Sequence, residues 1–481
     1  MNDWDIKPDM QPLKTSKTYD MPLYMQIYRR YREAIASGKL RPGDRVPSVR
    51  NLASELNLSR GTVEMAYQML SSEGYFLSRG PAGTVVSPRL KILHETEIPP
   101  VSGPLSSIIS PRASETGSVR PLQLGLPALD MFPRKTWARL AGHNLRSLEA
   151  MTMAYPAPTG YEPLRRAIAA YLGISRGIAC THEQVFITAG YQGALELVCR
   201  TLLQPGDTGW YEDPGYLLAR HFLERAGMLL EPVPVDEEGL NVDLGQQRAA
   251  RARFAVVTPT HQSPMGMALS LPRRLQLLEW ASHRQAWIIE DDYDSEFRYH
   301  GRPLPALKSL DREQRVLYTG TFSKVLFPGL RLAYLVVPYS QVERFADAAK
   351  YLCGPGTVQT QATVADFMEQ GHFARHLRRM RALYATRRGY LVNALQEKCG
   401  SALNIQPQAG GIHVLARLTA DASDRALAAA AQSHGLAIQA LNDWQRGRSL
   451  QGGLLMGFTN VTSAEMANDL VNRLVSATGL T

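Results

Sequence analysis

One short segment, residues 319–331, limits more than any other what this chain can be. It has the sequence TGTFSKVLFPGLR, in which Lys324 stands among small hydroxyl residues in an otherwise apolar setting. An amine held there is poorly solvated and lies near Arg331, so its pKa should fall and favour a Schiff base with an aldehyde. Thr321, Ser323 and Arg331 would suit a phosphate on that aldehyde. Pyridoxal 5'-phosphate (PLP) is the cofactor that needs both a lysine for its aldehyde and polar residues for its phosphate.

The bulk composition limits the class of protein. A chain of 481 residues is too long for one ordinary core and suggests two or three domains. Its 44% apolar and 20% charged residues are typical of a folded globular protein. The net charge of +9 is compatible with a polyanionic partner, although charge alone is weak evidence.

The cysteines and the apolar stretches suggest where the protein works. Four scattered cysteines without a CxxC pair favour reduced thiols over a zinc site or disulfides. The N-terminus lacks the pattern of a signal peptide, and no stretch of about eighteen apolar residues occurs. We therefore expect a cytoplasmic protein that makes no contact with a membrane.

Changes in composition divide the chain into four parts. Residues 1–20 are polar and are expected to form an arm, and residues 21–88 are compact and rich in helix signals. Residues 89–120 contain the sequence IPPVSGP followed by several serines, which indicates a linker. Residues 121–481 form the main domain.

The main domain alternates short apolar runs with longer amphipathic helices. Runs at residues 254–258, 286–290 and 317–319 end at polar residues, and the run at 332–337 is apolar to its end; buried parallel strands show this pattern. We predict an α/β domain with a mainly parallel sheet. Ligands of such sheets bind at the carboxyl ends of the strands, which is where these polar residues fall.

Residues 21–88 carry the pattern of a helix-turn-helix. Apolar residues at helical spacing predict a helix over 24–37. Two shorter helices are expected at 49–56 and 60–73, begun by the capping residues Ser48 and Ser59. The second of two such helices enters the major groove of DNA, with its first turn at the bases or phosphates.

Further residues in this part complete a winged helix. Residues 75–80 and 84–86 predict two strands of a wing, and ten basic against five acidic residues give residues 21–89 a net charge of +5. The motifs LxPGxRxPSxRxLA at 40–53, LSRxTV at 58–63 and EG at 73–74 resemble the winged helix of GntR-type bacterial regulators. A helical domain with solvated arginines is the alternative. The resemblance implies contacts with double-stranded operator DNA from Arg45, Ser48, Arg50, Ser59, Arg60, Thr62, Arg79 and Gly80.

Segments around the main sheet fit the same cofactor. Residues 290–294 have the sequence EDDYD after an apolar strand. A buried Asp291 would keep the pyridine nitrogen protonated, and Tyr293 would donate to the ring oxygen. Four carboxylates in five positions would also be compatible with a divalent metal, but we expect none. A small-residue turn at 190–192 begins a helix and offers backbone amides to an anion.

Together, residues 121–481 resemble fold-type I aminotransferases, and the whole chain resembles the MocR-like subfamily of GntR regulators. The resemblance implies that Lys324 forms the Schiff base, that Asp291 faces the ring nitrogen and that Tyr293 faces the ring oxygen. Tyr216 would stack on the ring. The phosphate would be held by Gly190, Tyr191, Gln192, Thr321, Ser323 and Arg331. Tyr155 would reach the phosphate of a partner subunit in a head-to-tail homodimer.

Two departures from the aminotransferase pattern concern the effector. The motif Asn-Pro-Thr-Gly is replaced by residues 263–266, SPMG, so that His261 or Gln262 would have to serve at the ring oxygen. The final core strand, 453–459, lacks the arginine that grips a substrate carboxylate. Arg446 or Arg448 would take that role, unless each is simply solvated.

The resemblance implies a transcription regulator. Its aminotransferase-like domain would sense PLP, or a small amine or amino acid, through aldimine exchange at Lys324. The alternative is an active aminotransferase with an accessory DNA-binding domain. We expect no steady turnover, although aminotransferase half-reactions are compatible with the residues present. A domain that serves only for dimerisation is disfavoured because both Lys324 and Asp291 are present.

Overall fold

The computed structural model describes residues 21–88, 119–147, 153–299, 304–352, 354, 356–405, 408–447 and 451–480. The chain divides into two compact units, Met1–Glu115 and Thr116–Thr481, and each is described by itself. The expected arm lies outside the described residues, as does nearly all of the expected linker, so these boundaries stay predictions. Among the described residues, no helix is long and apolar enough to cross a membrane.

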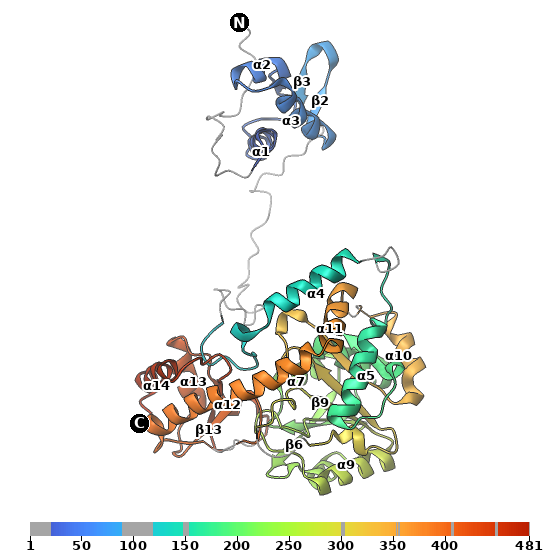
Figure 1. Cartoon of the computed structure of the whole chain (residues 1–481), viewed down its shortest axis with the longest axis vertical. Coiled ribbons are helices and arrows are strands. Elements are labelled where there is room, and N and C mark those ends of the chain that lie inside the picture. The colour runs from blue at the N-terminus through green and yellow to red at the C-terminus, as the bar shows by residue number, and fades with distance from the viewer. Residues whose placement is uncertain are drawn as a thin grey trace. The chain divides into compact units, whose positions relative to one another are not determined.

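Within the described residues 21–88, the N-terminal unit contains three α-helices, a short 3-10 helix (Gly80–Ala82) and a small antiparallel sheet (Figure 1). The helices are α1 (Leu23–Ala36), α2 (Val49–Glu55) and α3 (Arg60–Ser72), and the strands are β1 (Arg45–Val46), β2 (Phe76–Ser78) and β3 (Thr84–Val86). The sheet has the order β1-β3-β2, so β2 and β3 form the predicted wing. Strand β1 was not predicted, because two residues are too few to show a period.

Serine caps set the start of both short helices. The Ser48 hydroxyl accepts a hydrogen bond from the backbone N–H of Asn51 at 3.2 Å, and Ser59 accepts one from Thr62 at 3.2 Å. Each cap satisfies one of the backbone donors that a helix leaves unpaired at its start. Helices α2 and α3 therefore begin where the sequence predicts.

The C-terminal unit is built on a mixed, mainly parallel sheet. In spatial order its strands are β4 (Val185–Thr188), β11 (Ala333–Val336), β10 (Val316–Thr321), β9 (Trp287–Asp292), β8 (Phe254–Val257), β5 (Thr208–Asp213), β6 (Leu229–Asp236) and β7 (Gly239–Leu240). Strands β10, β9, β8, β5 and β6 run parallel to one another. The predicted α/β class is confirmed.

One strand runs against the expected direction. The run at 332–337 was expected to be of the parallel type, but β11 is antiparallel to both β10 and β4. The reason is the short connection: only eleven residues, 322–332, separate β10 from β11. A parallel crossover needs a dozen residues or more, usually with a helix.

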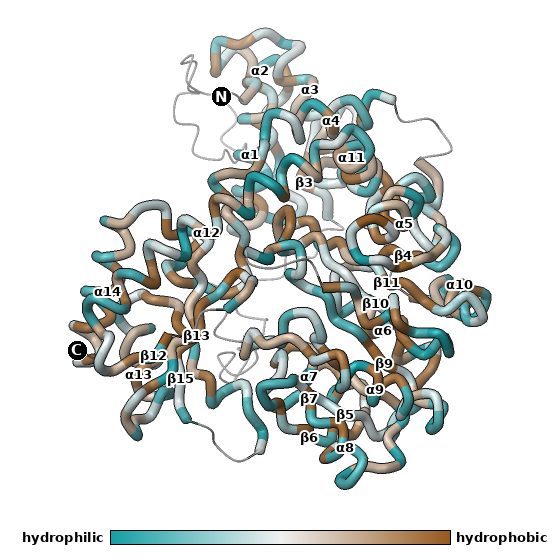
Figure 2. Tube along the Cα trace, turned by 60° about the horizontal axis from the view of Figure 1, so that its bottom comes forward, coloured by the Kyte–Doolittle hydropathy of each residue, from teal (hydrophilic) through white to brown (hydrophobic). Residues whose placement is uncertain are grey.

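Helices cover both faces of this sheet. Helices α6 (Gly190–Leu202) and α10 (Val342–Ala349) pack with buried residues of one face. Helices α5 (Glu162–Arg176), α8 (Val242–Arg248) and α9 (Leu271–Arg284) pack with residues of the other. Figure 2 shows brown, hydrophobic segments around β4, β9 and β11 in the middle of this unit. Helix α7 (Leu217–Arg225) follows β5.

The last part of the chain forms a second, antiparallel sheet. Its order is β12 (Leu403–Ile405), β13 (His413–Leu418), β15 (Gly453–Gly457) and β14 (Gln439–Ala440). Helices α13 (Asp424–Ser433) and α14 (Ala464–Thr478) accompany it, and the long helix α12 (His372–Cys399) leads into it (Figure 1). Helices α4 (Arg134–Arg146) and α11 (Val358–Glu369) contact each other.

Candidate cofactor and DNA-binding sites

Strand β9 sends its adjacent carboxylates to opposite faces of the sheet. Side chains alternate along a strand. Ile289 packs with α6 on one face, and Ile288 packs with α9 on the other. By the same alternation Asp291 belongs to the α6 face, whereas Asp292 accepts a hydrogen bond from Tyr318 at 2.6 Å on the α5 face. The carboxylates of EDDYD therefore do not converge on one point.

Asp291 is buried in a setting that disfavours its charge. Burial raises its pKa to about 8, helped by the nearby carboxylates of Asp292, Glu212 and Asp294, while the Tyr191 hydroxyl opposes the shift. The Tyr191 hydroxyl is buried beside this carboxyl, although the two groups do not have the geometry of a full hydrogen bond. A buried carboxyl of this kind is stabilised by a cationic N–H donor. A protonated pyridine nitrogen is such a donor.

Lys324 lies just beyond the end of the neighbouring strand, β10. The register pairs Thr319 with Asp291, which places the two strand ends side by side. The Nζ atom of Lys324 donates to the carbonyl of Gly125 at 2.7 Å. Burial lowers the pKa of Lys324, and the carboxylates of Asp294 and Asp291 partly offset this. The predicted lysine is thus an amine whose neutral, nucleophilic form is favoured.

Gly125 is a site residue that the sequence did not reveal. A Cβ atom at this position would lie 2.7 Å from Nζ of Lys324, and φ is +76°. Glycine is therefore needed both for the backbone conformation and for the approach of the lysine. No signal near residue 125 points to it, because the contact spans 199 positions of sequence.

Arg331 and the start of α6 lie together. Gly190 is the first residue of α6 and has a φ of +78°, and a Cβ atom there would lie 3.4 Å from the Arg331 guanidinium. A cavity of about 260 Å³ is lined by Thr188, Gln192 and Arg331, among others. Thr321 Oγ1 accepts from the backbone N–H of Ser323 at 3.1 Å. A helix N-terminus with an arginine over it is suited to a phosphate.

The structure also gives the neighbours of the residues expected at the ring face and at the ring oxygen of the cofactor. Tyr216 precedes α7 and its ring centroid lies 6.4 Å from that of Tyr191. The Tyr293 hydroxyl lies 2.9 Å from Nδ1 of His261. Gln262 instead donates to Glu212 at 3.0 Å. Of the two candidates to replace the missing asparagine, His261 is therefore the one in contact with Tyr293.

The remaining predicted residues of this unit are Arg446, Arg448 and Tyr155. Arg446 forms an ion pair with Glu224 at 2.5 Å, and its backbone N–H donates to Asp213 at 2.8 Å. Arg448 lies outside the described residues. The side chain of Tyr155 is fully exposed in this single chain.

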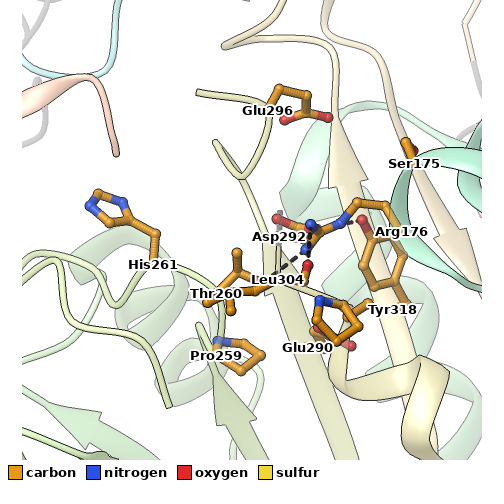
Figure 3. A network of polar contacts seen from close by, with 12 residues as sticks. Ser175, Arg176, Pro259, Thr260, His261, Glu290, Asp292, Glu296, Leu304 and Tyr318 are labelled. Atoms are coloured by element: carbon orange, nitrogen blue, oxygen red, sulfur yellow. Dashed lines mark hydrogen bonds and ion pairs between the residues drawn. The ribbon is translucent and has the colours of Figure 1, made fainter. Parts of the chain in front are cut away.

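On the opposite face, Arg176 holds the end of β9. Its guanidinium lies 2.7 Å from Asp292 and donates to Thr260 Oγ1 at 2.8 Å and to the carbonyl of Leu304 at 2.9 Å. Figure 3 shows Arg176 among these groups, with Tyr318 close by and His261 beyond Thr260. Arg176 comes from the last turn of α5, and nothing in the sequence around it indicates this role.

In the N-terminal unit, the predicted DNA-binding residues are on or near the surface. Arg45, Arg50, Arg60 and Arg79 are exposed, as are Ser48, Ser59 and Gly80, while Thr62 is half-buried. The Ser59 and Thr62 hydroxyls lie 2.7 Å apart at the start of α3. A Cβ atom at Gly83 would lie 3.1 Å from Nε of Arg45, so the Arg45 side chain passes over the wing turn.

These features define two classes of module: a winged helix-turn-helix, and a fold-type I PLP-dependent aminotransferase-like domain. Residues 23–86 match the family "Bacterial regulatory proteins, gntR family", and residues 134–474 match "Aminotransferase class I and II". A kynurenine aminotransferase from Pyrococcus horikoshii superposes with a TM-score of 0.68 at 27% identity, over 78% of this chain and 98% of that chain.

Two relatives match over nearly the whole chain. The probable rhizopine catabolism regulatory protein MocR of Rhizobium meliloti is 36% identical over 95% of this chain and 94% of its own length. The pyridoxine biosynthesis regulator PdxR of Corynebacterium glutamicum is 34% identical over 90% of this chain and 91% of its own. The chain belongs to the MocR-type subfamily of GntR transcriptional regulators, and its cofactor is PLP.

Proposed function

We propose that this protein regulates transcription by binding operator DNA through its winged helix, in response to PLP or to a small amine or amino acid. The observation that carries the proposal is the position of Lys324 and Asp291 at the ends of adjacent strands, in a chain that also carries a DNA-binding module. A degenerate domain kept only for dimerisation would have no need of a lysine whose pKa burial lowers.

Each edge of the cofactor has a proposed partner in this chain. PLP supplies an aldehyde for which Lys324 and an incoming amine compete. Asp291 would hold the proton at the ring nitrogen, and Tyr293, held by His261, would donate to the ring oxygen. Tyr216 would stack on the ring. The phosphate would lie at the start of α6, with Gly190, Tyr191 and Gln192 on one side and Thr321, Ser323 and Arg331 on the other.

An incoming amine changes the charge next to Lys324. The lysine is restrained by the Gly125 carbonyl on one side and faces the field of Asp294 and Asp291 on the other. If such an amine displaced it from the aldehyde, Lys324 would take up the proton that the incoming ammonium gives up, in the field of Asp294 and Asp291. Such a change alters DNA binding only if the two states of the protein differ in affinity for the amine.

The assembly that we propose is a head-to-tail homodimer. Tyr155 and the nearby Met153, both largely exposed in the single chain, support it, because neighbouring apolar side chains left in water mark a contact surface. Two winged helices in one dimer would contact two half-sites of the operator. We propose residues 21–88 as the DNA-binding domain and 121–481 as the effector domain, joined by the linker at 89–120.

The test is operator binding by the purified full chain, with DNA from its own promoter region. The measurement is made with and without PLP, with a panel of amines and amino acids, and repeated with Lys324→Ala. The relative named for pyridoxine biosynthesis makes PLP itself the first effector to test. We expect PLP or one amine to shift the DNA affinity of the wild type and to leave Lys324→Ala unchanged. Equal shifts in both proteins would refute the sensor.

An active aminotransferase is the second candidate. It is favoured by the likeness to enzymes, such as an aromatic-amino-acid aminotransferase of Thermococcus litoralis that is 28% identical over 72% of this chain. The missing substrate arginine in β15 argues against efficient turnover. Steady interconversion of an amino acid and a keto acid, together with DNA binding that ignores every ligand, would establish this alternative.

A further inference from the structure

A second and larger cavity lies beside the proposed cofactor site. It measures about 400 Å³ and is bounded by the loop around Met265, by the segment after β9 and by the start of β13. Lys324, Asp291 and Tyr216 do not line it. Its volume falls in the range of sites that bind small molecules.

The wall of this cavity contains polar atoms that the protein leaves unsatisfied. Four buried atoms lack a hydrogen-bond partner among the described residues: His261 Nε2, Ser295 Oγ, Arg298 Nε and Gln408 Oε1. His261 is 93% buried, since 7% of its surface is exposed. A buried polar atom without a partner costs free energy, so four around one cavity point to a polar occupant.

The charge in the wall favours an anion. Arg298 and Arg417 both line the cavity, and neither forms an ion pair within the described part of the chain. Within the described residues, the Arg417 side chain makes one hydrogen bond, a weak one of 3.8 Å to the sulfur of Met265. Of the two acidic residues in the lining, Asp294 is engaged by His261 at 3.1 Å and Glu237 is exposed.

We propose that this cavity is a binding site for the carboxylate of a small organic acid, with Arg298 and Arg417 as its anion contacts. Arginine suits this role because its planar donors match the two oxygens of a carboxylate. His261 and Ser295 offer further contacts to the carboxylate, whereas Gln408 Oε1 only accepts hydrogen bonds and does not serve the carboxylate. The occupant needs no amine, since Lys324 does not line the cavity.

One residue connects the cavity with the proposed cofactor site. His261 lines the cavity, and its Nδ1 lies 2.9 Å from the Tyr293 hydroxyl. Nε2 also lies against Gly411, where a Cβ atom would approach it to 2.7 Å. A carboxylate that binds Nε2 therefore changes the hydrogen bond that positions Tyr293. This consequence, unlike the binding itself, rests on the proposed role of Tyr293 at the cofactor's ring oxygen.

The experiment compares organic acids and phosphate, which cannot form a Schiff base with PLP, with an amine that can. The full chain, with and without PLP, is titrated by calorimetry with glutarate, with butyrate, with inorganic phosphate and with butylamine. The variants are Arg298→Gln, Arg417→Met and, as a matched control, Arg425→Met, which removes an exposed arginine paired with Asp443. Circular dichroism establishes that each variant is folded.

We expect glutarate or butyrate to bind the wild type and Arg425→Met equally. Arg298→Gln and Arg417→Met should each weaken that binding by about ten- to a hundredfold, the loss expected for one charged hydrogen-bond partner. In the PLP-loaded protein, the acid should also change the visible absorbance of the cofactor, and His261→Phe should abolish this change. The proposal would be overturned if phosphate were the only ligand that bound, or if carboxylates bound both arginine variants as tightly as the wild type. Binding of butylamine that depends on Lys324 tests the proposed function at the cofactor site and not the binding of acids in this cavity.

Discussion

The guanidinium of Arg176 lies 2.7 Å from the carboxylate of Asp292, and both side chains are at least 95% buried. Asp292 is the immediate neighbour of Asp291, so this ion pair fixes the end of the strand that carries the proposed cofactor contact. A buried pair is costly to break, because the charge that stays behind has lost both water and its partner.

Loss of Arg176 should therefore destabilise the C-terminal unit strongly. We expect Arg176→Met to lower the free energy of unfolding by about 3–5 kcal/mol. The double variant Arg176→Met, Asp292→Leu should recover part of this loss, since no charge is left unpaired. Denaturant unfolding followed by tryptophan fluorescence suits the test, because Trp137, Trp210, Trp280, Trp287 and Trp444 all lie in this unit.

The matched control for this prediction is on the same helix. Arg166 pairs with Glu162 on the exposed side of α5. Arg166→Met should cost less than about 1 kcal/mol, as exposed ion pairs do. Equal losses from Arg166→Met and Arg176→Met would contradict the prediction.

The buried carboxyls around Asp291 should make the stability of the cofactor-free protein fall as the pH rises. His376 and His413 contribute in the opposite direction below about pH 6.5, because burial lowers their pKa values to about 4. Burial raises the pKa of Asp291 to about 8, and burial also raises the pKa of Glu212 and of Glu290 to about 7. Unfolded carboxyls release their protons near pH 4. Between about pH 4 and 8 the folded chain thus holds protons that the unfolded chain loses, so stability declines by about 1.4 kcal/mol per pH unit for each such proton.

Asp291→Asn isolates the contribution of the cofactor contact. The variant should raise the melting temperature of the PLP-free protein at pH 8 and should bind PLP more weakly, because the carboxylate at the ring nitrogen is gone. Asp347→Asn, which changes an exposed carboxylate paired with Lys350, should do neither. Thermal scans at several pH values and PLP titrations measure the two effects. A lower melting temperature for Asp291→Asn at pH 8 would show that the buried charge of Asp291 does not destabilise the PLP-free protein.

Gly190→Ala should impair PLP binding. Its φ of +78° is costly for a residue with a Cβ atom, by about 1–2 kcal/mol, and that atom would lie 3.4 Å from the Arg331 guanidinium. Gly193→Ala in the same helix is the control, since its Cβ atom would make only an ordinary 3.5 Å contact with Thr188. PLP titration of both variants makes the comparison. Equal PLP affinities would argue that the phosphate binds elsewhere.

Ser59 combines a structural and a proposed DNA-binding role, which two substitutions separate. Ser59→Ala should destabilise the start of α3 by about 1 kcal/mol through loss of the cap. Ser59→Asp should retain the cap but weaken operator binding, most strongly at low salt, because it places a negative charge near the phosphates. Hydrogen exchange of the α3 amides and fluorescence anisotropy with operator DNA report the two effects. Unchanged DNA affinity in Ser59→Asp would place this turn away from the DNA.

The sequence by itself determined the features that depend on neighbours along the chain. Serine caps, apolar periods and the segment around Lys324 each act over a few residues, so the winged helix, the α/β class and the candidate lysine could be predicted. The direction of β11 was predicted wrongly, because strand direction depends on the length of the connection and not on the apolar run.

The tertiary structure decided which distant groups meet. Gly125 approaches Lys324 across 199 positions, and Arg176 reaches Asp292 from another helix. Strand alternation sent Asp291 and Asp292 to opposite faces, although they are adjacent in sequence. The cavity of Arg298 and Arg417 exists because the segment 297–299 pairs with 409–411. Such contacts are set by packing and sheet register, which no local sequence pattern contains.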